Sequence, residues 1–487
     1  MSRSLADQDG RSFDLVVIGL GPAGEKGAAQ AAYFGKRVAG IEAGAVGGAV
    51  VNTGTLPSKT LRETALYLSG LRSRNLYGIE YTFGRPISAE DLFYRQKLVE
   101  RSHLDQVEEN LARHDVAVLH GRASFEDGHT LAVRDAVGGC ARVRGDYVLI
   151  ATGSRPVRPP EVPFDDERVF DTDSILRLRR IPDELVIIGA GVIGSEYATL
   201  FAALGSRVTL VDGGARLLPF LDGEMATILA EQMREVGVRL LFAQHVGSIS
   251  CDDAGRVGVA LADSRVLDAD AVLYCGGRRG GTDGLALDRA GVVADARGRI
   301  AVDEHFATAA PGVYAAGDVI GFPALASTSM EQARVAVCHA FGFAYKRQVS
   351  ALIPYGLYTI PEVSMVGASE DALRASGTPY LVGRCAFGRN ARAQIAGDTT
   401  GLIKLLFDPD SRRVLGVHII GERASELVHV GQMCMQFGGT IDVFIENVFN
   451  FPTIADAYKY AAYDGLQALA RRANGAAADG AAGAGGA

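Results

Sequence analysis

Residues 14–24, with the sequence DLVVIGLGPAG, decide the fold of this chain. Their first half is an apolar run typical of a strand buried on both faces, and their second half has the G-x-G-x-x-G spacing. An alanine-rich helical segment (25–34) follows, and then a second apolar strand (38–42) that ends in an acid. This order predicts a dinucleotide-binding βαβ unit, in which glycines let the backbone approach a pyrophosphate and the acid binds a ribose. The residues that carry these roles are Gly19, Gly21, Gly24 and Glu42.

The same pattern occurs a second time. Residues 185–188 (LVII) lead into the glycine turn 189–194 (GAGVIG), a helix is predicted over 195–204, and the strand 207–212 ends at Asp212. Two such units form a long-range internal repeat, which implies two bound dinucleotides. Hydride relay between a nicotinamide and a flavin is the chemistry that needs such a pair. The fold class is therefore predicted as α/β with two Rossmann-like domains.

Composition and charge exclude several classes of function. With 487 residues, the chain is long enough for two to four domains. Its net charge of −8 and the lack of a dense Lys/Arg block argue against nucleic acid or a membrane as a partner. Six cysteines are scattered without CxxC spacing, which predicts no metal site and suits a reducing cytoplasm. No apolar run reaches eighteen residues, and residues 1–11 lack the apolar core of a signal peptide.

Residues 47–59, GGAVVNTGTLPSK, resemble the active-site segment of the flavoprotein disulfide reductases, the family of lipoamide dehydrogenase and glutathione reductase. The turn 151–156 (ATGSRP) and the Gly-Asp turn after the strand at 312–316 resemble the same family. The resemblance covers roughly residues 13–472 and implies FAD together with NAD(H) and NADP(H). It places FAD on Gly48, Lys59, Gly153, Asp318, Leu325 and Ala326 as well as the first glycine turn, and NAD(P) on Gly189, Gly191, Gly194, Asp212 and Gly277.

The resemblance also implies a domain plan. The FAD-binding domain would be discontinuous, comprising residues 1–155 and 284–349, with an NAD(P)-binding domain at 156–283 between its two parts. Residues 350–474 would form an α+β dimerisation domain, which implies a homodimer or a larger homo-oligomer. The remaining segment, 475–487, contains only Gly, Ala and one Asp, and is predicted to be disordered. Further helices are predicted over 60–76, 88–114, 224–237, 326–343, 369–376, 422–437 and 455–471.

Three positions depart from the resembled family. Val50 and Thr55 stand where those enzymes carry the two cysteines of a redox-active disulfide. Phe451, in the segment NFPTIAD (450–456), stands where they carry a histidine, although Asp456 keeps the carboxylate that would orient it. The thiols and the general acid for thiol chemistry are thus absent together, so electrons cannot leave through disulfide exchange.

The nicotinamide side matches the family. Lys59 aligns with the lysine beside the flavin, and Glu196 aligns with its acidic partner, so both are candidate catalytic residues. A chain that keeps the nicotinamide side and lacks the thiol side resembles the soluble transhydrogenase branch. The implied reaction is ping-pong hydride exchange from NADPH to NAD⁺ through FAD, and it needs no metal.

Asp212 leaves an alternative open. A carboxylate at this position suits the 2′-OH of NAD and repels the 2′-phosphate of NADP, although Arg216 is close enough in sequence to reach a phosphate. An NADH-dependent quinone or dye reductase of the same fold is the alternative activity. A degenerate, non-enzymatic scaffold is a third reading, and the undamaged glycine turns, Lys59 and Asp318 argue against it.

Overall fold

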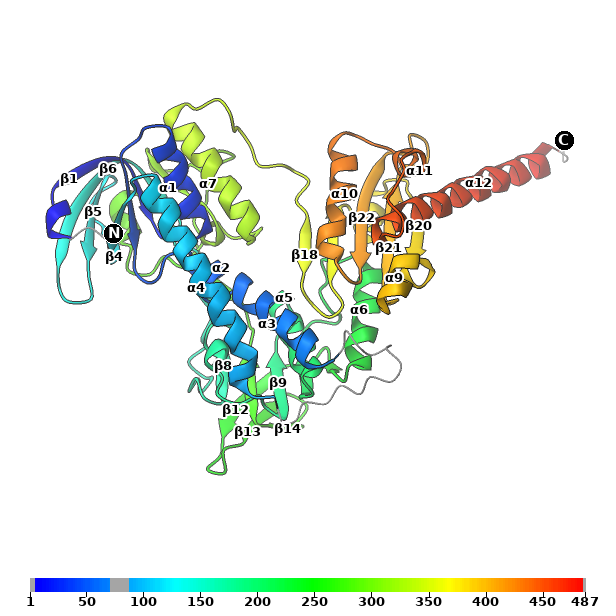
Figure 1. Ribbon diagram of the computed structural model, residues 1–487, viewed down its shortest axis with the longest axis horizontal. Coiled ribbons are helices and arrows are strands. Elements are labelled where there is room, and N and C mark those ends of the chain that lie inside the picture. The colour runs from blue at the N-terminus through cyan, green and yellow to red at the C-terminus, as the bar shows by residue number, and fades with distance from the viewer. Residues whose placement is uncertain (1–4, 71–86, 485–487) are drawn as a thin grey trace.

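Three large sheets, each covered by helices, organise the chain (Figure 1). The computed structural model describes residues 5–70 and 87–484. Residues 71–76, where the first of the further helices was predicted to end, lie outside the described residues. The sheets contain the strands of the predicted α/β organisation, while the exact domain boundaries remain predictions.

The first sheet has the strand order β3-β2-β1-β6-β5-β4, with β17 paired to β6. Its central strands are parallel and buried, and β4 and β5 add an antiparallel extension. β17 returns to this sheet long after β6 in the sequence, as a discontinuous domain requires. The strands are β1 (Arg11–Ile18), β2 (Val38–Glu42), β3 (Ala117–His120), β4 (Arg122–Phe125), β5 (Thr130–Arg134), β6 (Cys140–Ile150) and β17 (Val313–Ala315).

Helices cover this sheet and connect it to the second one. α1 (Pro22–Tyr33) packs against α7 (Ala326–Phe341) on one face. α4 (Ala89–Arg113) begins at a Ser88–Asp91 capping box and packs along α3 (Thr55–Leu68), which in turn contacts α5 (Val192–Ala203) of the second sheet. In Figure 1, α3 and α4 therefore run from the first sheet toward the second.

The second sheet repeats the parallel arrangement, with the order β11-β10-β9-β15-β8. A small antiparallel sheet (β12-β13-β14) lies beside it, and the β7–β16 pair joins the two nucleotide units. The strands are β7 (Ser154–Pro156), β8 (Val169–Asp171), β9 (Glu184–Ile188), β10 (Arg207–Val211), β11 (Arg239–Leu241), β12 (Val246–Cys251), β13 (Val257–Leu261), β14 (Val266–Ala269), β15 (Ala271–Tyr274) and β16 (Arg278–Gly280).

The third sheet is antiparallel, with the order β18-β19-β22-β21-β20, and α10 and α12 (Ala457–Ala484) pack against it. β18 ends at Leu357, because the following segment, which contains Pro361, leaves the ladder to contact α3 and α5. The elements are β18 (Tyr355–Leu357), β19 (Val363–Gly367), β20 (Leu381–Ala386), β21 (Leu402–Phe407), β22 (Val414–Ile420), α8 (Glu370–Ser376), α9 (Ala391–Ala396), α10 (Ala424–Gln436) and α11 (Asp442–Glu446).

The C-terminal helix differs from the prediction. α12 spans Ala457–Ala484, beyond residue 475, where the sequence predicts order to end. Alanine has the highest helix propensity, and a helix that already exists grows without a new nucleation step. The helix therefore continues through the alanines and projects away from the third sheet in Figure 1. Among the described residues, no helix combines the length and apolar character that a membrane crossing requires.

Candidate active site

The first glycine turn is shaped to hold an anion. Gly19 has φ +91°, and a Cβ on Gly24 would lie 1.8 Å from the Gly19 carbonyl oxygen, so neither position tolerates a side chain. Glu42 holds the turn in place: its carboxylate accepts hydrogen bonds from the Leu20 and Gly44 amides, both at 2.8 Å. The unsatisfied amides at the start of α1 therefore face a space that suits a pyrophosphate.

The second glycine turn repeats this geometry. Gly189 has φ +103°, and a Cβ on Gly194 would lie 1.9 Å from the Gly189 carbonyl oxygen. The Asp212 carboxylate accepts hydrogen bonds from the Ala190 and Gly214 amides, both at 2.6 Å. In both turns the acid lies 22 residues after the amide of the turn that it binds. The internal repeat predicted from sequence thus extends to individual hydrogen bonds.

Further polar groups beside the first turn suit the remainder of an FAD molecule. α2 (Gly48–Asn52) lies so close that a Cβ on Gly48 would be 2.7 Å from the Gly21 Cα, so the two glycine backbones pack directly on each other. Asp318 accepts a hydrogen bond from Ser154 Oγ at 2.8 Å, next to Gly153, and the buried Thr152 hydroxyl has no partner among the described residues. These polar groups converge on the carboxyl end of the first sheet, where such folds bind their ligands.

The N-terminus of α7 is open to a ligand. Leu325 is the N-cap residue and Ala326 the first helical residue, and no side chain caps the amides of the first turn. The hydroxyls of Thr328 and Ser329 bind the Leu325 carbonyl instead. Positive potential at this helix end therefore remains available to a group that carries negative charge.

Lys59 and Glu196 form an ion pair between α3 and α5, with 2.6 Å between Nζ and Oε2. The second Glu196 oxygen accepts the Tyr358 amide at 2.9 Å, and the Lys59 ammonium lies 4.9 Å from the centroid of the Tyr358 ring. The carboxylate is nearly buried, whereas the ammonium is one quarter exposed. The two predicted catalytic residues, 137 positions apart, therefore meet between the two nucleotide units.

Sequence reasoning missed a second group in the same region. Arg62 donates to the Thr359 carbonyl at 3.0 Å and lies 3.3 Å from Glu362. Burial raises the pKa of Glu362, against the opposing effects of Arg62 and Ser425. The segment 358–363 (YTIPEV) matches the family, but sequence analysis assigned it only to the C-terminal domain. In the structure it runs along α3 and α5 and holds the lysine–glutamate pair.

The two positions that carry the redox-active cysteines in the resembled enzymes hold an apolar residue and an exposed residue here. Val50 is half-buried in α2, and Thr55 is exposed at the start of α3, with Thr53 and Gly54 separating the two helices. All six cysteines lie elsewhere and are free. Phe451, at the position of the family's histidine, is 69% exposed in the C-terminal domain.

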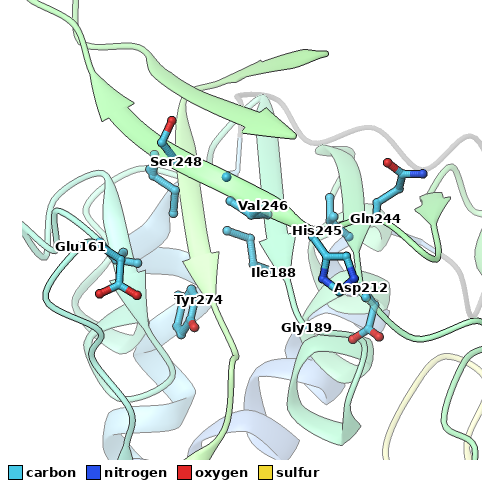
Figure 2. A pocket seen from close by; sticks show the side chains of 14 residues that line it. Glu161, Ile188, Gly189, Asp212, Gln244, His245, Val246, Ser248 and Tyr274 are labelled. Carbon is cyan, nitrogen blue, oxygen red and sulfur yellow. The ribbon is translucent and has the colours of Figure 1, made fainter. Parts of the chain in front are cut away.

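A cavity of about 330 Å³ lies beside the second glycine turn (Figure 2). Gly189 and Asp212 line it together with residues 244–249. Gly277 is not among the lining residues, and its carbonyl accepts the Val157 amide at 3.0 Å. Arg216, considered from sequence for a phosphate, does not line the cavity. Its guanidinium binds Asp371 at 3.2 Å and the Pro219 carbonyl at 2.7 Å, because the third sheet's domain offers it a carboxylate.

Comparison with known proteins places this geometry in a family. The model for the pyridine nucleotide-disulphide oxidoreductases matches residues 13–340, and the model for their dimerisation domain matches residues 353–462. The chain belongs to this family. The predicted fold class is thereby confirmed, and so is the assignment as an FAD-dependent oxidoreductase that works with pyridine nucleotides.

Several relatives carry a narrower name. The soluble pyridine nucleotide transhydrogenase of Mycobacterium bovis is 47% identical over 93% of this chain and 97% of its own length. The soluble pyridine nucleotide transhydrogenase of Hahella chejuensis is 42% identical over 94% of this chain and 99% of its own length. Among solved structures, LpdA from Mycobacterium tuberculosis superposes with a TM-score of 0.86 at 27% identity, covering 93% of this chain and 99% of LpdA. The flavoprotein disulfide reductase RclA from Escherichia coli superposes with a TM-score of 0.84 at 28% identity, covering 93% of this chain and 99% of RclA.

Proposed function

We propose that this enzyme exchanges hydride between NADPH and NAD⁺ through FAD, without a redox-active disulfide. The observation that carries the proposal is a contrast: the Lys59–Glu196 pair of the nicotinamide side is assembled, whereas Val50 and Thr55 occupy the dithiol positions. The names of the relatives that are 40–47% identical support the same activity. When bound, FAD would supply the carrier that takes a hydride from one nicotinamide and gives it to another.

The residues of the chain would bind and orient both partners. In this proposal Gly19, Gly21, Gly24 and Glu42 hold the adenosine and pyrophosphate of FAD, Gly48 and Gly153 give it space, and Asp318 binds its ribityl chain. The Lys59 ammonium and the α7 N-terminus at Leu325 and Ala326 would favour negative charge on the flavin ring. Gly189, Gly191, Gly194, Asp212 and Gly277 would form the pyridine nucleotide site.

A ping-pong order follows from the number of sites. The described residues contain one further glycine turn of this type after the first, so both pyridine nucleotides would use it in turn. Glu196 fixes the Lys59 ammonium at the junction of the two nucleotide units, where a nicotinamide and a flavin would meet. Val50 and Phe451 carry no group that could accept electrons or protons, which would confine the chemistry to the nicotinamide side.

The C-terminal domain supports a homodimer, and assembly into a larger homo-oligomer stays a proposal. We also place the enzyme in the cytoplasm, where a reducing environment keeps thiols such as its six cysteines unpaired.

One observation favours a second activity. Asp212 faces the pyridine nucleotide cavity, and Arg216 is turned away from it, which disfavours a 2′-phosphate. An NADH-dependent quinone or dye reductase is therefore the competing function. Steady-state assays of the FAD-loaded protein, run with NADPH and with NADH as donors, separate the two when thio-NAD⁺, a quinone and lipoamide are compared as acceptors. Transfer to thio-NAD⁺ supports hydride exchange, quinone reduction with NADH alone supports the competitor, and lipoamide turnover would contradict both.

A further inference from the structure

The cavity beside Asp212 contains one side chain that can become a cation. His245 lines it next to Asp212 and Gly213, and Figure 2 shows the His245 ring beside the Asp212 carboxylate. No lysine or arginine is among the described residues that line this cavity. Because the acid at this strand end binds the ribose 2′-OH in such folds, the His245 ring lies where a 2′-substituent would enter.

The backbone fixes the position of this ring. A Cβ on Gly213 would lie 2.7 Å from His245 Cε1 and 3.0 Å from Nδ1, so the ring packs directly on the glycine backbone. The loop that carries it is bound on both sides: Gln244 donates to the Asp212 carbonyl at 3.0 Å, and Ala262 donates to the His245 carbonyl at 2.8 Å. Glycine at position 213 therefore makes room for an imidazole where a larger residue would displace it.

The ring nitrogens are available for a ligand. Neither has a hydrogen-bond partner within the described part of the chain. The charged groups that line the cavity with it are Asp212 at the end of β10 and Glu161 across the cavity, with Tyr274 completing the wall. The β13–β14 turn, bound to the His245 carbonyl through the Ala262 amide, carries Asp263 and Arg265, which pair with each other. The surroundings of the ring are thus predominantly negative.

We propose that His245 determines whether this site accepts a 2′-phosphorylated adenosine. The imidazolium offsets the charge of Asp212 and donates to the 2′-phosphate, whereas the neutral ring leaves Asp212 to select the 2′-OH. Because acid pH favours the protonated form of an imidazole, the contribution of His245 to phosphate binding should be greater at pH 6 than at pH 8. This inference rests on the proposed function, because it concerns the two nucleotides that are exchanged.

The test uses ligands without a nicotinamide, so it does not depend on hydride transfer. Calorimetry measures binding of adenosine 2′,5′-bisphosphate and of 5′-AMP to the FAD-loaded protein at pH 6 and pH 8. We expect His245→Gln to weaken the bisphosphate about tenfold at pH 6 and to have little effect at pH 8, in line with loss of one charge-assisted hydrogen bond. Affinity for 5′-AMP should stay unchanged, which also shows that the variant folds.

Arg216→Ala is the matched control, because its guanidinium is bound to Asp371 and should not contribute. Equal bisphosphate affinity of wild type and His245→Gln at pH 6 would overturn the proposal. A loss of the same size at both pH values would also overturn it, and a loss in Arg216→Ala alone would assign the phosphate to the arginine. Titration of the phosphate itself is common to all three proteins and cancels in the comparison.

Discussion

At the scale of single residues, the Lys59–Glu196 pair is the feature that most directly connects the geometry of the site to its proposed chemistry. Partly buried ion pairs contribute little to stability once desolvation is included, so stability is a weak reason for this arrangement. The pair instead fixes a positive charge between the two nucleotide units, and the Tyr358 amide fixes the carboxylate in turn. A fixed charge at the reacting ring stabilises the transition state without reorganisation.

Replacing Lys59 with methionine should therefore slow flavin reduction by NADPH by about 10²–10³-fold, the usual effect of removing one preorganised charged donor. Stopped-flow absorbance of the flavin measures this rate directly. Lys59→Arg keeps the charge and should retain more of the rate, while FAD content stays the same in both. Reduction of the methionine variant at the wild-type rate would show that the ammonium has no part in the chemistry.

Individual residues show what the sequence could and could not predict. Lys59, Glu196 and Val50 were selected as candidates from motifs that lie in continuous stretches, and the structure brings Lys59 and Glu196 together. Arg216 was misjudged, because its direction depends on Asp371, which is 155 residues away. Arg62 and Glu362 were missed for the same reason: their partners come from distant elements and leave no local pattern.

At the scale of elements, the two glycine turns are equivalent in form and differ in the ligand proposed for each. Each has a strand, a helix that starts at the turn, and an acid that binds the turn's amide. Both were predictable because strand, turn and helix signals are local. The course of residues 358–363 along α3 and α5 was not, because it depends on contacts with Glu196 and Thr199, more than 160 residues earlier.

Because the two turns are equivalent in form, a matching substitution in each should abolish FAD binding in one variant and NADH binding in the other. Gly194→Ala should leave a yellow, FAD-containing protein that no longer binds NADH, because the new Cβ would meet the Gly189 carbonyl at 1.9 Å. Gly24→Ala should prevent FAD binding through the matching clash at 1.8 Å. FAD content by absorbance and NADH binding by fluorescence titration measure both effects.

Gly191→Ala provides the control, because a Cβ there meets no protein atom within 4 Å. Its stability should be unchanged, whereas NADH binding should weaken through contact with the ligand itself. Normal NADH affinity in both Gly191→Ala and Gly194→Ala would mean that the nucleotide does not bind at this turn.

At the scale of the whole molecule, a buried charge cluster joins the second and third sheets. Lys404 on β21 is fully buried, 2.8 Å from Asp222 and 2.9 Å from Glu224 of the nucleotide unit. Its ammonium also binds Glu370 on α8. The three carboxylates are close enough together to hold a metal ion, but they already share this ammonium. No sequence signal predicted the cluster, because its members are dispersed over 182 residues.

The Lys404 cluster predicts a defined dependence of stability on pH. Burial alone would raise the pKa values of Asp222, Glu224 and Glu370. Hydrogen bonds from Lys404, and from Arg384 to Glu224, have the opposite and larger combined effect together with the charges nearby, so each pKa lies below its ordinary value. The stabilisation is thus complete above the ordinary carboxyl values of 3.8 and 4.5 and is lost as pH falls through the folded-state pKa values.

Lys404→Met should lower the free energy of unfolding by about 3–5 kcal/mol at pH 7, since it leaves the fully buried Asp222 carboxylate without a cation. The difference from wild type should shrink below pH 4, where the carboxylates become protonated. Denaturant unfolding at several pH values measures both effects. Arg384→Ala, which removes a partly exposed partner of Glu224, should cost only about 1 kcal/mol. A difference that does not change with pH would contradict this explanation.

The exposed apolar residues of the third sheet's domain predict a self-association surface. Phe437, Val448 and Phe451 are 85%, 94% and 69% exposed in the single chain, within the segment that matches the dimerisation domain. Exposed apolar residues mark interaction sites where they form a contiguous patch, and the dimerisation domain is where such a patch is expected. A Phe437→Glu/Val448→Glu double variant should therefore sediment as a monomer. Val137→Glu, at a 93% exposed position outside this domain, should remain dimeric, and dimers of the double variant would locate the interface elsewhere.

One anaerobic single-turnover measurement tests the central claim most directly. The FAD-loaded protein is reduced with one equivalent of NADPH, freed of NADP⁺, and mixed with NAD⁺ while flavin absorbance and NADH are followed together. Hydride exchange predicts that the flavin is reoxidised and that one NADH forms per flavin, with no reaction when lipoamide replaces NAD⁺. A flavin that stays reduced with NAD⁺ but is reoxidised by lipoamide would contradict the account.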